Sequence, residues 1–282
     1  MPNTKRNNRI SRSSNLIFMI KTFISISIVC FYLFQSCKSS ENKVEEKPEP
    51  PQHVYKEIKI GRALAAKFIK KYGLVQNMDQ TKYLNFIGGK IAELSPRQEL
   101  NFKFGVLNTP EVNAFACPGG YIFITQGALN LIENEAELVG VLSHEVSHVS
   151  LYHSGKFETK EEVWIDLVAS MLSPGGDMVS SVMEAASKEL EESMLENGRQ
   201  KEFETQADSS AAILISQLGY DLNAYIEYLK KMKSTQANEV FIKTHPPVDD
   251  RINAMQKFIS EQKLPKAGKT NVKRYRQNIP KA

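Results

Sequence analysis

The sequence of 282 residues contains only three cysteines. Cys30 lies inside an apolar run near the N-terminus and Cys37 follows that run, so we expect the first to be removed with an export signal and the second to carry lipid. Cys117 would then be the remaining thiol of the folded part, which excludes an internal disulfide there. We interpret Cys117 as a small buried apolar residue rather than as a redox group.

Acidic residues are missing from both ends of the chain, although the formal net charge is only +4. Residues 1–36 hold five basic side chains, residues 262–282 hold seven, and neither segment has an Asp or a Glu. Residues 37–261, in contrast, hold 24 basic and 32 acidic side chains. An acidic main part gives little electrostatic support to a nucleic-acid partner, and we predict none. We expect residues 262–282 to be a disordered basic tail.

The N-terminal segment has the order of an export signal, with basic side chains before an apolar run over residues 22–34. We predict that residues 1–36 are a signal peptide, that Cys37 is lipidated and anchors the chain to a membrane, and that residues 37–54 form a polar tether. The alternative is an uncleaved anchor, because residues 16–34 are nearly long enough to span a membrane. Either reading places the folded part in the bacterial cell envelope, facing the periplasm, without deciding between the inner and the outer membrane.

Histidine is also scarce, with five in the chain, yet His144 and His148 form an H-E-x-x-H motif. On a helix these side chains lie about 40° apart and one turn from each other, so both imidazoles could hold one metal ion from the same side. Zn²⁺ favours such nitrogen ligands. Glu145 lies beside them, where it could take a proton from a metal-bound water. The alternative is an ordinary amphipathic helix with two histidines on its surface.

The sequence around the motif predicts where this helix begins and which side it buries. Asn134 is a suitable N-cap, with Glu137 as its capping-box partner. We expect an apolar stripe roughly opposite the histidines, formed by Leu138, Leu142, Val146 and Val149. His153 lies five residues beyond His148 and would point about 140° away from it, so we interpret His153 as a helix-end residue that interacts with the helix dipole.

A zinc hydrolase usually has three protein ligands and leaves one position for water. A metzincin would place its third histidine at Ser154, so that pattern fails. Glu204 and Asp208 are better candidates because they lie one helical turn apart. One carboxylate could bind the metal while the other orients a ligand imidazole. Glu202 is a rival ligand, but it has no carboxylate four residues later.

Several motifs follow one another in a fixed order: Asn113-Ala114-Phe115-Ala116-Cys117-Pro118-Gly119-Gly120-Tyr121-Ile122-Phe123, then Asn134-Glu135-Ala136-Glu137-Leu138, His144-Glu145-x-x-His148, Glu204-x-x-x-Asp208, and His245-Pro246-Pro247 with Arg251. Over about residues 55–260 the chain resembles metallopeptidase family forty-eight, a gluzincin family, and particularly its bacterial periplasmic lipoprotein proteases and the related mitochondrial inner-membrane protease. Cys117 departs from this pattern, where an aliphatic residue is expected.

The resemblance implies a set of roles for these residues. His144, His148 and Glu204 would bind one zinc ion per chain, Glu145 would be the catalytic base, and Asp208 would support a ligand. His245 would lie in the active site, either donating to the oxyanion of the tetrahedral intermediate or filling the open position of the zinc. Its alternative is a histidine in a capped loop. Arg251 is better explained as a structural residue that pairs with a nearby carboxylate.

The resemblance also implies an α+β fold that is mostly helical, with a small sheet beside the active-site helix. We predict a zinc metallopeptidase domain over residues 55–261. The residue pattern adds a helix that ends before Gly73, a helix over residues 79–94, and three strands, over residues 102–106, 112–117 and 121–124.

Two further segments have more than one interpretation. The edge strand that contains Asn113, Ala114 and Phe115 could bind an extended substrate through its main chain, or it could be an ordinary structural hairpin. Residues 157–196 read as a helical hairpin that forms core, or as a lid over the cleft.

Together these features predict a zinc-dependent endopeptidase. The family resemblance, and no residue by itself, implies that its substrates are unfolded or misassembled envelope proteins and that it acts in protein quality control. One alternative is a periplasmic chaperone or binding protein whose zinc site is structural or blocked. Another is a gluzincin that acts on a cell-wall peptide.

Overall fold

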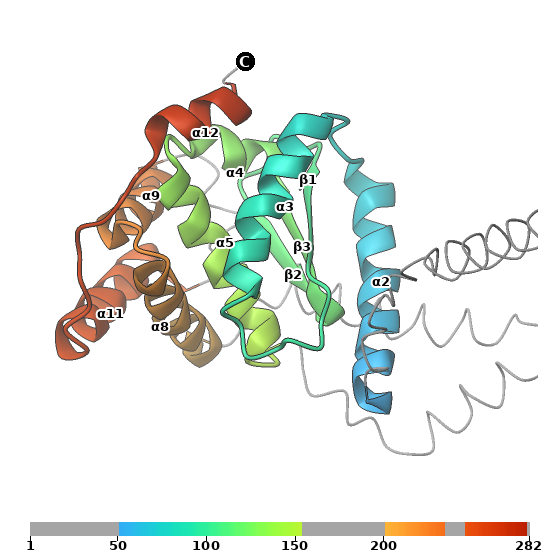
Figure 1. Ribbon diagram of the computed structural model, residues 1–282, viewed down its shortest axis with the longest axis horizontal. Coiled ribbons are helices and arrows are strands. Elements are labelled where there is room, and N and C mark those ends of the chain that lie inside the picture. The colour runs from blue at the N-terminus through green and yellow to red at the C-terminus, as the bar shows by residue number, and fades with distance from the viewer. Residues whose placement is uncertain (1–50, 154–200, 235–245, 281–282) are drawn as a thin grey trace, which may run out of the picture. The chain divides into compact units, whose positions relative to one another are not determined.

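The computed structural model describes residues 51–153, 201–234 and 246–280 (Figure 1). Helices account for most of these residues, and the predicted fold class, mostly helical with a small sheet, is confirmed. The helices are α2 (Gln52–Tyr72), α3 (Met78–Ala92), α4 (Gln126–Leu131), α5 (Glu135–Ser150), α8 (Lys201–Gln217), α9 (Leu222–Ser234), α11 (Val248–Glu261) and α12 (Val272–Asn278). The strands are β1 (Lys103–Leu107), β2 (Ala114–Cys117) and β3 (Tyr121–Thr125), and the 3₁₀ turn η1 (Pro118–Gly120) joins the last two. None of the described helices is long and apolar enough to cross a membrane.

The sheet has the strand order β1-β3-β2. β2 and β3 form the predicted antiparallel hairpin, with Phe115 opposite Phe123. The hairpin turn needs glycine at Gly119, whose φ of 70° lies in the left-handed region and whose Cβ would meet the backbone of Ile58 at 2.6 Å. β1 joins the other side of β3 in parallel. This order leaves β2 as an outer strand.

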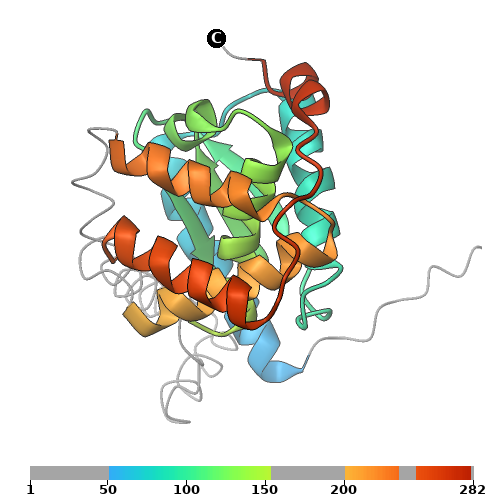
Figure 2. The same ribbon diagram turned by 90° about the vertical axis from the view of Figure 1, so that its left-hand side faces the viewer.

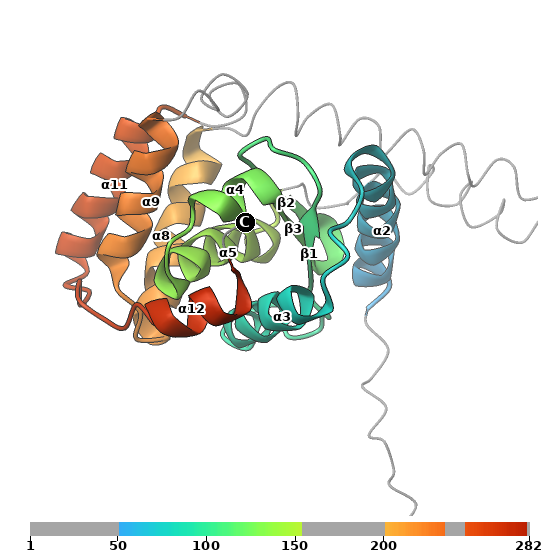
Figure 3. The ribbon, with the colours of Figure 1, turned by 90° about the horizontal axis from the view of Figure 1, so that it is seen from above.

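Side chains alternate between the two faces of the sheet, and the two faces pack against different helices. Phe104 and Ile122 belong to the larger core with α3 and α5, whereas Phe115 and Phe123 pack with Phe68 of α2 in a second, smaller core. Figure 3 shows α2 on one side of the strands and α5 on the other. Cys117 is fully buried in the smaller core and forms no disulfide, as predicted.

Helix α5 is buried on every side, which differs from the single apolar stripe that we expected. All residues from Glu135 to Ser150 are buried. α3 and the sheet cover one side of the helix, and α8 and α9 cover the other (Figure 2). The predicted N-cap is confirmed, because the Asn134 side chain accepts a hydrogen bond from the Glu137 amide at 3.0 Å. The histidine side of the helix is therefore also an interior surface.

The C-terminal segment is ordered, so the prediction of a disordered tail from residue 262 is wrong. Helix α12 lies within it, and its Tyr275 is 1% exposed. The reason is a buried carboxylate at the start of α5: Glu135 accepts hydrogen bonds from Asn271 at 2.7 Å and from the Arg274 guanidinium. Tyr83 and Tyr220 donate to the same carboxylate at 2.6 and 2.5 Å.

Helical structure is also present slightly before the predicted domain limit of residue 55. Helix α2 starts at Gln52, inside the segment 37–54 that we expected to be a tether. The folded unit therefore extends beyond the predicted limits of 55 and 261 at both ends. The signal peptide, Cys37 and the hairpin at 157–196 lie outside the described residues.

The Glu135 cluster predicts a pH-dependent stability. Burial raises the pKa of this carboxyl, but hydrogen bonds from Arg274, Tyr220, Tyr83 and Asn271 lower it more, from 4.5 to about 2. Because the folded pKa is depressed, the stabilisation is complete above pH 4.5 and is lost as the pH falls toward 2. We expect Glu135→Gln to lower the free energy of unfolding by about 2 kcal/mol at neutral pH, less than the full pKa shift implies because Arg274 is half exposed.

Urea unfolding at several pH values measures this effect. The difference between the variant and the wild type should shrink as the pH falls through that window. Glu227→Gln, which removes an exposed carboxylate paired with Lys230, should change little. Equal unfolding curves for Glu135→Gln and the wild type would contradict this role of Glu135.

Candidate metal centre

Helices α5 and α8 bring three buried polar side chains to one point. His144 and His148 come from α5 and Glu204 comes from α8, and one ligand atom of each lies within 4.8 Å of the others. Nε2 of His144 lies 3.0 Å from Nε2 of His148 and 3.4 Å from the Glu204 carboxylate. Nε2 of His148 lies 3.2 Å from the same carboxylate. The three side chains therefore form a compact triangle, in which the two ring nitrogens approach different oxygens of the Glu204 carboxylate.

These distances fit a tetrahedral metal site. A zinc–nitrogen distance of about 2.1 Å places neighbouring tetrahedral ligand atoms about 3.4 Å apart. Two ring nitrogens and one carboxylate oxygen also form the donor set of a zinc hydrolase, with a fourth position left for water. The described residues offer one such group of His, Cys, Asp and Glu side chains. The site can therefore hold a divalent cation with the ligands that the resemblance implied.

Small residues on α8 allow the two helices to approach. Ala207 and Ala211 are fully buried, and the hydroxyl of Ser147 on α5 donates to that of Ser210 on α8 at 2.9 Å. Glu204 is fully buried by this contact. Glu202, the rival ligand, is exposed on the other side of the helix.

Asp208 contacts His144 on the side of the ring that faces away from the other two side chains. Its Oδ1 atom lies 2.8 Å from Nδ1 of His144, the ring nitrogen that faces away from the triangle. Arg251 donates to both oxygens of this carboxylate, at 2.8 and 2.7 Å, and Tyr225 donates at 3.3 Å. The ion pair predicted for Arg251 is therefore confirmed. Asp208 can fix the Nδ1–H tautomer of His144, which leaves a lone pair on Nε2 for a cation.

The charges of this network are set by its neighbours. Burial raises the pKa of Asp208, but Arg251 and His144 lower this pKa by more, so that it falls to about 2. For His144, burial and Arg251 lower the pKa, whereas Asp208 and Glu204 raise it, with a net result of about 9. Because a metal ligand must be a neutral imidazole, a cation at Nε2 competes with that proton.

His153 is the residue that the sequence interpretation missed. Its Nδ1 lies 2.9 Å from Nδ1 of His148, and its Nε2 lies 3.1 Å from the amide oxygen of Gln206. The ring also stacks on Phe203 with a centroid distance of 4.6 Å. The predicted direction was wrong because it assumed a continuing helix. α5 ends at Ser150, and Tyr152 adopts a φ of 57°, which turns His153 back.

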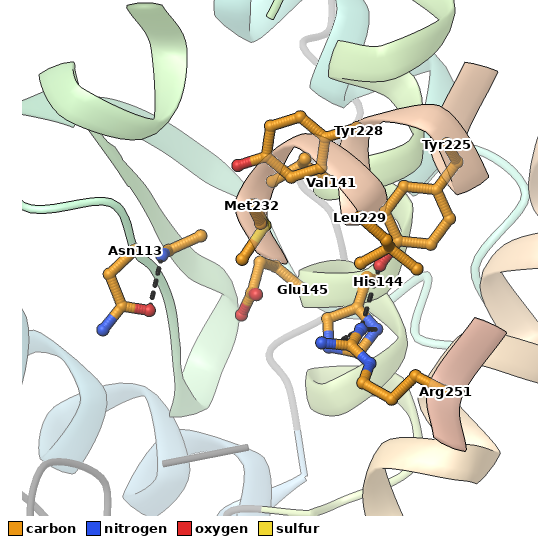
Figure 4. Close-up of a pocket in the computed structure, with 10 residues that line it drawn as sticks. Asn113, Val141, His144, Glu145, Tyr225, Tyr228, Leu229, Met232 and Arg251 are labelled. Carbon is orange, nitrogen blue, oxygen red and sulfur yellow. Dashed lines mark hydrogen bonds between the residues drawn. The ribbon is translucent and has the colours of Figure 1, made fainter. Parts of the chain in front are cut away.

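Glu145 lines a small pocket next to the triangle (Figure 4). The pocket has a volume of about 20 Å³, enough for about one water molecule. Asn113 and Ala114, at the start of β2, form one wall, and helix α9 forms another with Tyr228 and Met232. Glu145 therefore lies where a single water could contact both its carboxylate and a cation held by His144.

One predicted site residue, Phe115, lies in the predicted strand but offers only its main chain to the site, and another lies outside the described residues. The Phe115 ring packs against Phe68 on the α2 face of the sheet, at a centroid distance of 4.7 Å, so its side chain points away from the pocket. Only the main chain of Phe115 can contribute to a binding edge. His245 lies outside the described residues.

Comparisons with known proteins address the family directly. Residues 79–259 match the sequence profile of Peptidase family M48. The chain belongs to this family. The matched range includes helices α5 and α8, and therefore contains His144, His148 and Glu204.

Several known proteases are similar to the chain over 58–65% of its length. The mitochondrial metalloendopeptidase OMA1 of Schizosaccharomyces pombe is 26% identical over 191 residues, which are 65% of this chain and 54% of that protein. The beta-barrel assembly-enhancing protease of Escherichia coli is 26% identical over 186 residues, 61% of this chain and 37% of that protein. The human mitochondrial OMA1 is 20% identical over 176 residues, 58% and 33%. The chain thus spans about half, or less, of the length of these relatives.

The Asp208 contact predicts a change in metal affinity. Asp208→Asn keeps the shape of the side chain but removes the charge that holds His144, so we expect zinc affinity to fall about 10- to 100-fold. Competition with a coloured chelator measures this, and circular dichroism checks the fold. Asp221→Asn, at the start of α9, is the matched control. Unchanged zinc affinity in Asp208→Asn would rule out this role of Asp208.

Proposed function

We propose that the chain is a zinc-dependent endopeptidase. The observation that carries this proposal is the triangle of His144, His148 and Glu204, with Glu145 on the adjacent pocket wall. Its two nitrogens and one oxygen favour zinc among the divalent metals. Zinc, when bound, lowers the pKa of its water toward about 7 and polarises the scissile carbonyl.

The residues of the chain have separate tasks in this proposal. Glu145 accepts the proton of the attacking water and passes it to the leaving amine. Asp208 and His153 hold the far nitrogens of the two ligand imidazoles, which fixes the direction in which each ring presents Nε2. Arg251 forms an ion pair with Asp208, and this pair offsets the cost of burying a second carboxylate beside Glu204.

The outer edge of β2 is a suitable place for the substrate. Within the described residues, β2 pairs only with β3, and its first residues lie on the pocket wall. An extended polypeptide could add to this edge through main-chain hydrogen bonds. Because such binding reads the backbone, we propose cleavage of unfolded or flexible segments with little sequence preference.

The bacterial relatives, which are named beta-barrel assembly-enhancing proteases, support a role in the cell envelope. We propose that the substrates are misfolded or misassembled envelope proteins. We further propose that lipid on Cys37 anchors the chain to a membrane with the protease domain facing the periplasm.

One observation favours the alternative of a chaperone or binding protein with a blocked site. Among the described residues, the pocket beside Glu145 has a volume of only about 20 Å³, enough for about one water molecule. In the endopeptidase reading, the scissile bond needs more room than this beside Glu145. The following variant separates the two functions.

Glu145→Gln should abolish casein cleavage, with a loss of about 100- to 10,000-fold, because the amide cannot accept the proton. Zinc content, measured by metal analysis, should remain one per chain. Glu227→Gln is the control and should cleave as the wild type does. Casein cleavage by Glu145→Gln at the wild-type rate would exclude the proposed mechanism, and absence of cleavage by the zinc-loaded wild type would favour the chaperone.

Recognition of the backbone at β2 can be tested through the substrate. A peptide with two N-methylated amides near the scissile bond loses two hydrogen bonds, each worth about 1 kcal/mol. We expect kcat/KM to fall about 10- to 30-fold. The control peptide has the same methyl groups far from the cleavage site. Equal cleavage of both peptides would show that the enzyme does not bind its substrate as an added strand.

A further inference from the structure

A second hollow is lined by residues of α2, of β1 and of the segment between α2 and α3. Figure 3 shows that α2 lies on the side of the strands opposite α5. We call this hollow the α2–β1 slot; its volume is about 440 Å³, within the range of small-ligand sites. Its walls are mainly apolar, and three small residues provide the space: Ala65, Ala66 and Gly105. Phe123 lies beside Gly105, where an added Cβ would approach its ring to 3.2 Å. Larger side chains at Ala65 or Ala66 would therefore fill the slot.

Positive charge is concentrated at one end of the slot. Arg62 and Lys103 both line it and both are exposed to solvent. Tyr121 connects them: Arg62 Nε donates to its hydroxyl at 3.3 Å, and Lys103 Nζ lies 5.9 Å from its ring centroid. The described residues that line the slot include no Asp or Glu. A single anionic group would therefore meet two cations at this end.

The other end of the slot is partly open and has no charged side chain, although the polar side chains of Gln76, Asn77 and Thr81 also line it beside the apolar ones. Ile69 and Met78 line it with exposed fractions of 37% and 70%. Ile69 lies seven residues after Arg62 on α2, which corresponds to about 10 Å along the helix. The slot is therefore amphipathic along its length, with charge at the Arg62 end and hydrocarbon at the Ile69 end.

The hydrogen bonds of β1 argue against a polypeptide as the occupant. Val75 donates its amide to the carbonyl of Val106 at 2.9 Å. The Asn85 side chain accepts from the amide of Phe104 at 3.1 Å and donates to its carbonyl at 2.8 Å. The outer edge of β1 is thus already used by the protein, so an extended chain would find no main-chain partners there.

We propose that the α2–β1 slot binds a free fatty carboxylate, with its carboxylate between Arg62 and Lys103 and its hydrocarbon chain along Gly105 toward Ile69. An acyl chain gains from burial against the mainly apolar walls and needs no hydrogen bonds from them. The carboxylate keeps contact with water at the exposed end, so its charge is not buried. This inference does not depend on the proposed protease activity.

Calorimetric titration of the full chain with laurate tests the slot. Ala66→Trp places a large side chain in the slot from an exposed helix position, and it should abolish saturable laurate binding. Ala63→Trp, on the same helix but outside the slot lining, should bind laurate as the wild type does. Equal binding by both variants, or absence of binding by the wild type, would overturn the proposal. Glu145→Gln should bind laurate normally, which separates this result from the fate of the protease.

The charged end requires a separate test. Arg62→Glu combined with Lys103→Glu should weaken laurate binding at least tenfold, whereas Lys70→Glu combined with Lys71→Glu, the same charge change elsewhere on α2, should have a small effect. Dodecyltrimethylammonium, which has the same chain and the opposite charge, should bind more weakly than laurate to the wild type. Equal affinity for both amphiphiles would overturn the role of the two cations. Binding to phosphatidylglycerol vesicles that Ala66→Trp abolishes, without binding of laurate, would identify a membrane lipid instead and overturn the free carboxylate.

Discussion

The structure depends on the burial of a polar triangle inside a helical core. His144, His148 and Glu204 are almost inaccessible to water, and such groups are costly to bury unless each has a partner. A cation shared by all three would be the simplest partner, and it would join α5 and α8, two helices that are far apart in the sequence. The proposed metal would therefore also help to hold α5 against α8.

A second layer of contacts makes the triangle rigid. Asp208 and His153 each approach the ring nitrogen that faces away from the centre, and Arg251 in turn holds Asp208. Each of these contacts comes from a different structural element: α8, the turn after α5, and α11. The two imidazoles are thus held at the ring nitrogens that face away from the centre, which orients the Nε2 atom of each toward a metal.

The sheet separates two surfaces with different chemistry. On the α5 side, the start of β2 lies beside Glu145 and leaves an outer edge for a peptide backbone. On the α2 side, the backbone edge of β1 is already occupied, and the apolar α2–β1 slot remains. One small sheet can in this way support a site that reads main-chain groups and another that accepts hydrocarbon.

Features that repeat within one helical turn could be predicted from the amino-acid order. The spacing of His144 and His148, and of Glu204 and Asp208, follows from 3.6 residues per turn, so these pairs could be found without coordinates. Contacts that depend on a change of chain direction or on distant partners became visible only in the folded chain. His153 turns back because Tyr152 leaves the helical conformation.

The C-terminal segment shows the same limit. Locally it reads as a run of solvated charges, and nothing near Arg274 in the sequence indicates a partner. Its carboxylate, Glu135, lies 139 residues earlier and is buried at the start of α5. Long-range pairing of this kind is set by packing of the whole core, and local sequence patterns do not encode it.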